Sequence, residues 1–168
     1  MKDTSINIIP KPTSIKKFNQ YFDLNSIKTI NIENNSKYEK HIAELFKSYL
    51  KPLKDLEIEH TINDPKNKIN ISLSAQHNLG KEEYELNISD LGFITIKASH
   101  DPGLFYGFQS FRQLCDPNLE KGLKPKTSFI PSCRIKDTPS FGYRGMHLDV
   151  SRHFFNVDFI KTYIDMIA

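Results

Sequence analysis

Two alternating segments joined by a four-residue turn place the strongest constraint on the fold. Residues 83–88 and 93–98 both alternate apolar and polar side chains, with the two-residue period of a β-strand that has one face buried. Between them, Ser89, Asp90 and Leu91 lead to Gly92, a residue that adopts positive φ without steric cost. The pattern predicts an antiparallel hairpin with one face turned inward and the other turned to water.

Two segments with helical spacing can cover the inward face. Residues 37–50 place apolar side chains three and four positions apart, and Pro52 ends the helix. Residues 102–114 repeat this spacing, with Pro102 at the first helical position and Asp101 as the expected N-cap. Because each segment has a single apolar stripe, we expect both helices on one face of an antiparallel or mixed sheet.

Further strands are predicted where extended, β-prone runs recur. These are residues 5–10 (an edge strand, because Pro10 ends it), 27–33, 56–62, 69–73 and 129–135. Residues 63–67 are expected to form a turn by composition. Together the elements describe an α+β domain over residues 1–138, with a boundary between Thr138 and Ser140.

Composition narrows the classes of partner and cofactor. The 168 residues are 38% hydrophobic and 26% charged, as in a globular protein with a core. A net charge of +3 without a long basic run predicts no nucleic-acid partner, and no apolar run approaches the ~20 residues of a membrane span. Cys115 and Cys133 are interpreted as small apolar side chains, with a disulfide as the alternative. Neither lies near a ligand cluster, so the sequence predicts no metal and no cofactor.

The last part of the chain combines an apolar run, a polar loop and an amphipathic helix. Residues 146–150 suit a buried strand, residues 151–153 are polar, and Asn156 can cap a helix over residues 157–168. A strand followed directly by a helix is half of a βαβ unit, which requires a second parallel strand. We therefore expect residues 139–168 to be the beginning of a second domain, truncated after its first βα unit.

Two motifs in this part of the chain carry a family resemblance. Tyr143-Arg144-Gly145, followed by the run LDVSRHF at residues 148–154, closely resembles the opening of the catalytic barrel in family 20 glycoside hydrolases, the β-N-acetylhexosaminidases. Residues 103–114 resemble the helix that closes the small domain before that barrel, and residues 135–139 resemble the linker. The resemblance implies an α+β domain followed by the first βα unit of a truncated (β/α)8 barrel.

The resemblance also implies a reaction. Enzymes of this family remove terminal β-linked GlcNAc or GalNAc from glycans by a substrate-assisted retaining mechanism that uses an Asp-Glu pair. This sequence contains no Asp-Glu dipeptide, so we expect no catalytic residue in it and no activity of the chain alone. The family resemblance suggests a secreted or periplasmic protein, although residues 1–4 lack the apolar core of a signal peptide.

Arg144 is the predicted substrate-binding residue. By resemblance, its guanidinium holds hydroxyls of the sugar in the −1 subsite, and the alternative is a structural pair with a carboxylate such as Asp149. Asp149, Arg152 and His153 follow the predicted strand, where barrel enzymes place functional groups. We expect an Asp149–Arg152 ion pair that fixes the loop, and a stacking or capping role for His153 rather than that of a general base.

Two further expectations concern the chain as a whole. The alternative to a hexosaminidase is an independent, non-catalytic module that binds a glycan or a protein, and such a module would end in a capped helix. Residues 143–168 carry apolar side chains without sister strands to cover them. We therefore expect this segment to be the least securely held part of the chain and to promote self-association.

Overall fold

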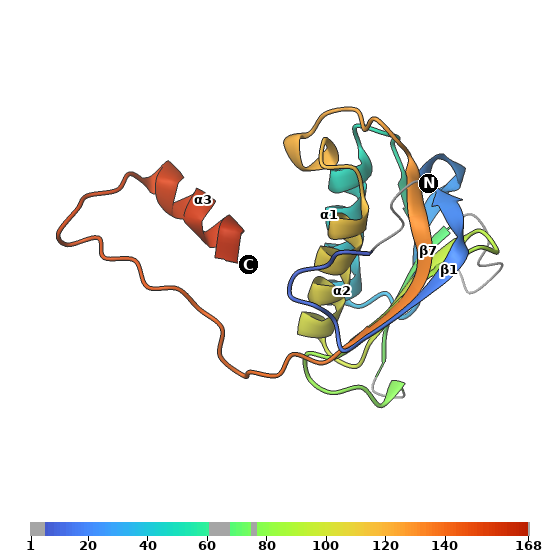
Figure 1. Cartoon of the computed structure of the whole chain (residues 1–168), viewed down its shortest axis with the longest axis horizontal. Coiled ribbons are helices and arrows are strands. Elements are labelled where there is room, and N and C mark those ends of the chain that lie inside the picture. The colour runs from blue at the N-terminus through green and yellow to red at the C-terminus, as the bar shows by residue number, and fades with distance from the viewer. Residues whose placement is uncertain (1–5, 61–67, 75–76, 168) are drawn as a thin grey trace. The chain divides into compact units, whose positions relative to one another are not determined.

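The structure is a computed structural model that describes residues 6–60, 68–74 and 77–167. The chain divides into two compact units, Met1–Thr138 and Pro139–Ala168, which are described separately (Figure 1). None of the helices in the described ranges is long and apolar enough to cross a membrane.

The first unit contains a seven-stranded mixed sheet in the order β1-β7-β5-β6-β4-β2-β3. Its strands are β1 (Ser14–Asp23), β2 (Thr29–Ile32), β3 (Glu57–Glu59), β4 (Lys68–Leu73), β5 (Tyr84–Ser89), β6 (Phe93–Ala98) and β7 (Phe129–Asp137). The pairs β1–β7, β7–β5 and β5–β6 are antiparallel. The pairs β6–β4, β4–β2 and β2–β3 are parallel. Short 3-10 helices lie at Leu24–Ser26 and Leu119–Lys121.

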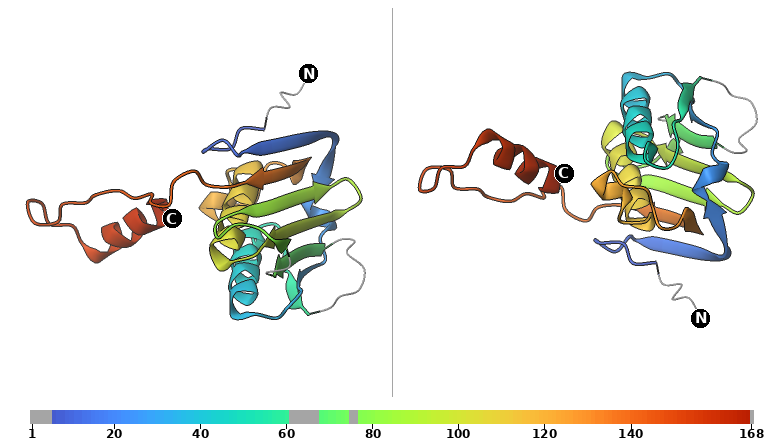
Figure 2. Two further views of the ribbon diagram at one scale, coloured as in Figure 1. Left: turned by 90° about the horizontal axis from the view of Figure 1, so that it is seen from below. Right: turned by 90° about the horizontal axis from the view of Figure 1, so that it is seen from above.

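Helices α1 (Lys37–Leu50) and α2 (Asp101–Leu114) lie side by side on one face of this sheet (Figures 1 and 2). The ring of Phe46 in α1 packs 4.7 Å from that of Phe108 and 4.9 Å from that of Phe111, both in α2. The mixed sheet with two helices on one face is therefore confirmed. Asp101 is not the N-cap: the helix starts at Asp101 itself, and His100 occupies the cap position without a side-chain bond.

A capping box explains where α1 begins. The hydroxyl of Ser36 accepts a hydrogen bond from the backbone of Glu39 at 3.1 Å, and the Glu39 carboxylate accepts from the backbone of Ser36 at 2.9 Å. Glu39 is fully buried, and the backbone N–H of Asn34 donates to the same carboxylate at 3.1 Å. The buried carboxyl group of Glu39 is thus held by several donors, as burial of a polar group requires.

The predicted hairpin is confirmed. Strands β5 and β6 pair antiparallel, with Leu86 opposite Ile96 and Ile88 opposite Ile94. All four of these side chains are buried, and Gly92 in the turn has φ of 95°. The inward face of the hairpin therefore forms the centre of the core beneath α2.

The predicted edge strand at residues 5–10 is wrong for the residues described. The backbone N–H of Ile9 donates to the side-chain amide oxygen of Gln113, and the Ile9 carbonyl accepts from the same amide, both at 2.9 Å. These groups are satisfied by a helix side chain, so residues 6–10 are not a strand, and β1 forms the edge of the sheet beside β7. The predicted turn at residues 63–67 lies outside the described residues.

Both cysteines are unpaired and buried, which confirms their interpretation as small apolar side chains. Cys133 lies in β7 and Cys115 directly follows α2. Burial raises the pKa of Cys133 to about 12 and that of Cys115 further still. Both thiols therefore stay protonated near neutral pH.

The second unit contains helix α3 (Val157–Ile167). The side chain of Asn156 accepts a hydrogen bond from the backbone of Phe159 at 2.8 Å, which confirms the predicted cap. The predicted strand at residues 146–150 does not form in this structure, because these residues have no strand partner among the described residues. A parallel strand takes its hydrogen bonds from neighbouring strands, and an apolar pattern alone cannot supply them.

Candidate functional site

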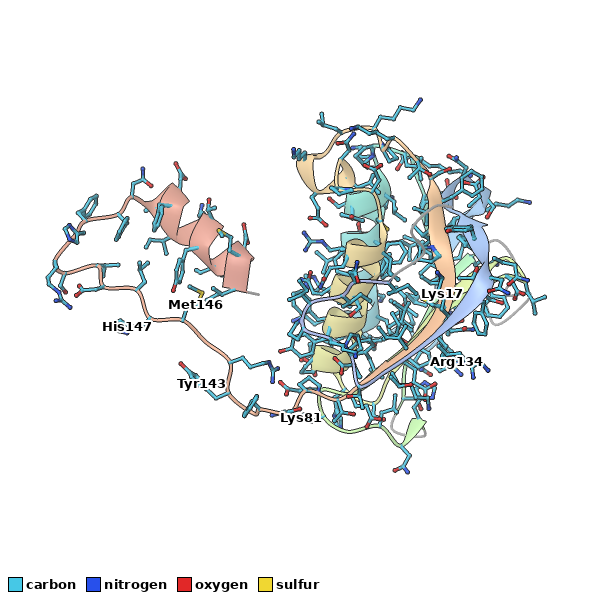
Figure 3. The ribbon with its side chains drawn as sticks, viewed as in Figure 1. Lys17, Lys81, Arg134, Tyr143, Met146 and His147 are labelled. Carbon is cyan, nitrogen blue, oxygen red and sulfur yellow. The ribbon has the colours of Figure 1, made fainter. Side chains whose placement is uncertain are left out.

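All four predicted site residues lie in the segment that leads to α3. Figure 3 shows this segment, with Tyr143, Met146 and His147 labelled along it. One terminal nitrogen of the Arg144 guanidinium donates a hydrogen bond to the backbone carbonyl of Phe141, three residues earlier. The Arg144 side chain is exposed and turns back along its own loop.

Asp149 is the centre of a local hydrogen-bonded turn. Its carboxylate accepts from the backbone N–H groups of Ser151 at 2.9 Å and Arg152 at 3.1 Å, and it forms an ion pair with the Arg152 guanidinium. The backbone bond from Arg152, then its guanidinium, then the bond from Ser151 lower the pKa of Asp149. The expected Asp149–Arg152 ion pair is therefore present.

The structure brings Asp149 and Arg152 together and places Arg144 against Phe141. His153 follows directly in the chain, and its side chain is exposed. The roles of Arg144, Asp149, Arg152 and His153 toward a substrate stay predictions. No cluster of three or more metal-ligating side chains occurs in the described part of the chain.

A second arginine, Arg112 in α2, has a structural environment. Its guanidinium pairs with the Glu120 carboxylate and lies 5.5 Å from the ring centre of Tyr49 and 5.8 Å from that of Phe108. The bond to Glu120 raises the pKa of Arg112 further, and burial raises the pKa of Tyr49. Arg112 thus ties α2 to α1 and to the following loop.

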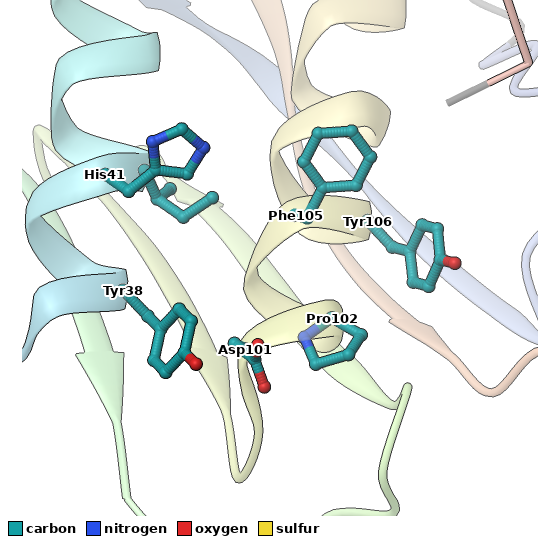
Figure 4. A pocket seen from close by; sticks show the side chains of 7 residues that line it. Tyr38, His41, Asp101, Pro102, Phe105 and Tyr106 are labelled. Carbon is teal, nitrogen blue, oxygen red and sulfur yellow. The ribbon is translucent and has the colours of Figure 1, made fainter. Parts of the chain in front are cut away.

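Sequence reasoning did not find a groove of about 260 Å³ between the first turns of α1 and α2 (Figure 4). Its lining residues are mostly aromatic or apolar, with one imidazole and one carboxylate: Tyr38, His41, Ile42, Asp101, Pro102, Phe105 and Tyr106. Each helix contributes aromatic residues near its start, which was the only signal in the sequence. The groove exists because the two helices pack together, and its lining belongs entirely to residues 1–138.

Comparison with known proteins gives two family matches in succession. Residues 5–138 match the family described as glycosyl hydrolase family 20, domain 2. Residues 141–168 match glycosyl hydrolase family 20, catalytic domain. The first match alone covers most of the chain.

Individual relatives agree with these matches. A β-hexosaminidase of Porphyromonas gingivalis is 36% identical over 172 residues, covering 99% of this chain and 21% of its own length. A β-hexosaminidase of Vibrio furnissii is 28% identical and is covered over 24% of its length. The chain therefore spans about a fifth to a quarter of these curated relatives.

Solved structures show the same fold. The Streptomyces plicatus N-acetyl-β-hexosaminidase in complex with Thio-NAglucal superimposes with a TM-score of 0.81 at 30% identity, covering 95% of this chain and 31% of that one. The β-N-acetylhexosaminidase of Streptomyces coelicolor gives a TM-score of 0.82 at 30% identity, covering 95% and 32%. With a family match over residues 5–138 and these relatives, the chain belongs to glycoside hydrolase family 20.

Proposed function

We propose that this chain is the N-terminal part of a β-N-acetylhexosaminidase that removes terminal β-linked GlcNAc or GalNAc from glycans. The observation that carries the proposal is the succession of two family matches, domain 2 and then the catalytic domain, in one chain. The relatives are named as hexosaminidases, and one Streptomyces plicatus structure holds the product GlcNAc. The mechanism implied by the family is substrate-assisted and retains the anomeric configuration.

In this proposal, residues 1–138 are a non-catalytic α+β domain and residues 139–168 begin a (β/α)8 barrel. The division of contacts after Thr138 supports this assignment, as do the capped helix α3 and the apolar run at residues 146–150 before it. That run becomes the first barrel strand when neighbouring strands supply hydrogen bonds to it.

Arg144 is the residue proposed to bind substrate. A guanidinium offers a rigid fork of N–H donors, and adjacent sugar hydroxyls can each accept one of them. The exposed Arg144 side chain and the ion pair that fixes the neighbouring Asp149 turn support this role. Asp149 and Arg152 then act by holding the loop, and His153 by stacking or capping.

The general acid and the residue that orients the acetamido group are proposed to lie outside residues 1–168. The reaction in this family uses an Asp-Glu pair, and this chain has no such dipeptide. The residues present can hold one edge of a hydroxylated ring, but they cannot protonate a glycosidic oxygen. We infer that the chain alone is inactive.

We also propose that the second unit makes the 168-residue chain associate with a second copy of itself. Phe154 is 91% exposed, Met166 is 80% exposed and Val157 is 67% exposed. No residue of α3 is buried among those described. Fully burying an apolar side chain of this size lowers the free energy by about 1.5–3 kcal/mol relative to leaving it exposed. Association that covers these side chains is therefore favourable.

The activity is tested with the intact gene product and an aryl N-acetyl-β-glucosaminide. We expect hydrolysis with retention, which proton NMR detects as the β-anomer of GlcNAc appearing first. The Arg144→Gln variant should lose about 10- to 100-fold in kcat/KM, as expected for loss of a charge-assisted hydrogen bond.

Lys161→Gln is the matched control, because it removes a positive charge from exposed α3 without touching the predicted site. Formation of the α-anomer first, or equal activity of Arg144→Gln and the control, would contradict the assignment.

A further inference from the structure

The face of the sheet opposite the helices carries a continuous line of polar side chains, which we call the polar row. It follows the strand register from β1 across β7, β5, β6 and β4 to β2, and consists of Lys16, Arg134, Asn87, Thr95, Asn70 and Asn31. The next residues along these strands, such as Ile135, Leu86 and Ile96, are buried on the helix side. Since side chains alternate along a strand, the polar row lies on the outer face.

One end of the polar row is strongly basic. Lys16 and Arg134 lie directly opposite each other in the β1–β7 pair, and both are exposed (Figure 3, where Arg134 is labelled). Like charges at directly opposed positions of an antiparallel pair destabilise it. Within the described residues, neither side chain forms an ion pair, and the Lys16 ammonium lies 5.8 Å from the ring centre of Phe18. The Lys16–Arg134 pair therefore lowers the stability of the sheet, and such locally unfavourable choices are expected where a surface serves a function.

The neighbouring register adds to this charge. Lys136 in β7 forms an ion pair with Glu85 in β5, and Lys97 in β6 lies opposite the same glutamate. One carboxylate therefore faces two lysines beside the Lys16–Arg134 pair. The excess positive charge at this end favours the binding of an anion.

The rest of the polar row is neutral, and a hydrogen bond joins two of its members. Asn87, Thr95 and Asn70 are partly exposed. Asn31 at the end of the row is buried, and its side-chain amide donates to that of Asn70 at 3.2 Å. Amide and hydroxyl groups both donate and accept, as sugar hydroxyls do. None of the six side chains of the row is aromatic or apolar, whereas nucleic-acid bases stack on aromatic side chains and protein interfaces have an apolar centre. The Phe18 ring beside Lys16 is half-buried, with the Lys16 ammonium over it.

We propose that the polar row binds an anionic glycan. Sulfate or carboxylate groups of the glycan meet Lys16 and Arg134, and its hydroxyls meet Asn87, Thr95 and Asn70. Adjacent strands are about 4.8 Å apart, so the row is long enough for a short oligosaccharide. The polar row belongs to the first unit, whereas Arg144 belongs to the second. The proposal goes beyond hydrolysis, because the row binds charged chains without cleaving them.

The test is fluorescence anisotropy of the 168-residue chain with labelled oligosaccharides. The probes are dextran sulfate, oligogalacturonate and unmodified dextran of equal length, which separate sulfate, carboxylate and neutral sugar. We expect at least one charged probe to bind about tenfold more tightly than dextran, with affinity that falls as salt is added.

Variants locate the binding surface. Lys16→Gln and Arg134→Gln should each weaken binding by about twofold to fivefold, as for single exposed charge contacts. Asn87→Ala should weaken binding as well. Lys40→Gln, an equal charge change at an exposed position of α1, should have no effect. Lys97→Gln provides the same test from β6 if circular dichroism shows that one of the other variants is misfolded.

Three results would overturn the proposal. The first is equal binding of charged and neutral dextran, and the second is equal weakening by Arg134→Gln and Lys40→Gln. The third is polyglutamate of matched charge binding as tightly as the glycans, which would mean that the surface recognises acidic protein or charge alone. Hydrolysis of an aryl substrate by the intact protein should be unchanged by Arg134→Gln, so this test is independent of the proposed activity.

Discussion

The hydroxyl groups of Tyr84 in β5 and Ser110 in α2 lie 2.5 Å apart in the core and share a hydrogen bond. Tyr84 is 1% exposed and Ser110 is 5% exposed. Burial raises the pKa of Tyr84 to about 12, so the phenol stays neutral and can act as donor or acceptor. This bond fixes α2 against the sheet at a defined register.

Replacing Ser110 by alanine should destabilise the first unit by about 1–3 kcal/mol, because it leaves the Tyr84 hydroxyl buried without a partner. The free energy of unfolding is measured by urea titration. The double variant Ser110→Ala with Tyr84→Phe should cost less than the sum of the single variants, since it removes both polar groups. Strict additivity would show that the hydrogen bond does not couple the two residues.

Gly103 should not tolerate a side chain. A Cβ at this position would lie 2.9 Å from the Cβ of Ala98 and closer still to the backbone oxygen of Glu83. Alanine favours a helix by about 1 kcal/mol over glycine, but overpacking against backbone costs about 1–3 kcal/mol. We expect Gly103→Ala to lower the unfolding midpoint in urea.

Gly80→Ala is the control for that change, because its added Cβ would make an ordinary 3.4 Å contact with the Glu83 side chain. It should leave the midpoint nearly unchanged. A stabilising effect of Gly103→Ala would mean that α2 lies farther from the sheet than the structure shows.

Periodicity predicts well those elements in which one face is apolar and the opposite face is polar. The hairpin β5–β6 and the helices α1 and α2 were predicted because their apolar residues keep a strict period. Strand β1 was missed because residues 16–21 are polar or aromatic without alternation, and its pairing with β7 shifts register between Lys17 and Tyr21. An irregular edge strand is defined by its neighbour, which periodicity does not reveal.

The same distinction holds for the candidate site. The Asp149–Arg152 pair was predictable because its members are three residues apart in one loop. The groove between α1 and α2 was not, because it depends on how two helices distant in sequence pack together. The strand predicted at residues 146–150 illustrates the converse, since an apolar run does not create the neighbouring strands that it needs.

The Asp149 carboxyl should titrate below its ordinary value of 3.8. Because its pKa is lowered, the order that it confers on the loop is complete above that value and is lost as pH falls through the lowered pKa. Carbon-13 NMR of the side-chain carboxyl measures the midpoint. Arg152→Gln should raise the midpoint while leaving it below 3.8, since the backbone donors of Ser151 and Arg152 remain.

Lys161→Gln is the control for this titration and should leave the Asp149 midpoint unchanged. A midpoint that does not respond to Arg152→Gln would show that the ion pair is absent in solution.

Self-association of the isolated chain should depend on the apolar side chains of the second unit. Sedimentation equilibrium should show a concentration-dependent rise in mass, and Phe154→Ser combined with Met166→Ser should reduce it, because both side chains are exposed. Leu91→Ser in the turn between β5 and β6 is the control, since Leu91 is 70% exposed in the first unit. A strictly monomeric parent chain would refute the expectation.

The most direct test of the proposed function compares the intact gene product with residues 1–168 alone, under equal conditions, on an aryl N-acetyl-β-glucosaminide. The measurement is the initial rate of aryl release at saturating substrate. Our account predicts turnover by the intact protein and no release above the blank by the isolated chain, because the chain has no Asp-Glu pair. Two results would contradict it. One is aryl release by residues 1–168 that a single substitution within these residues abolishes, and the other is no release by the folded intact protein.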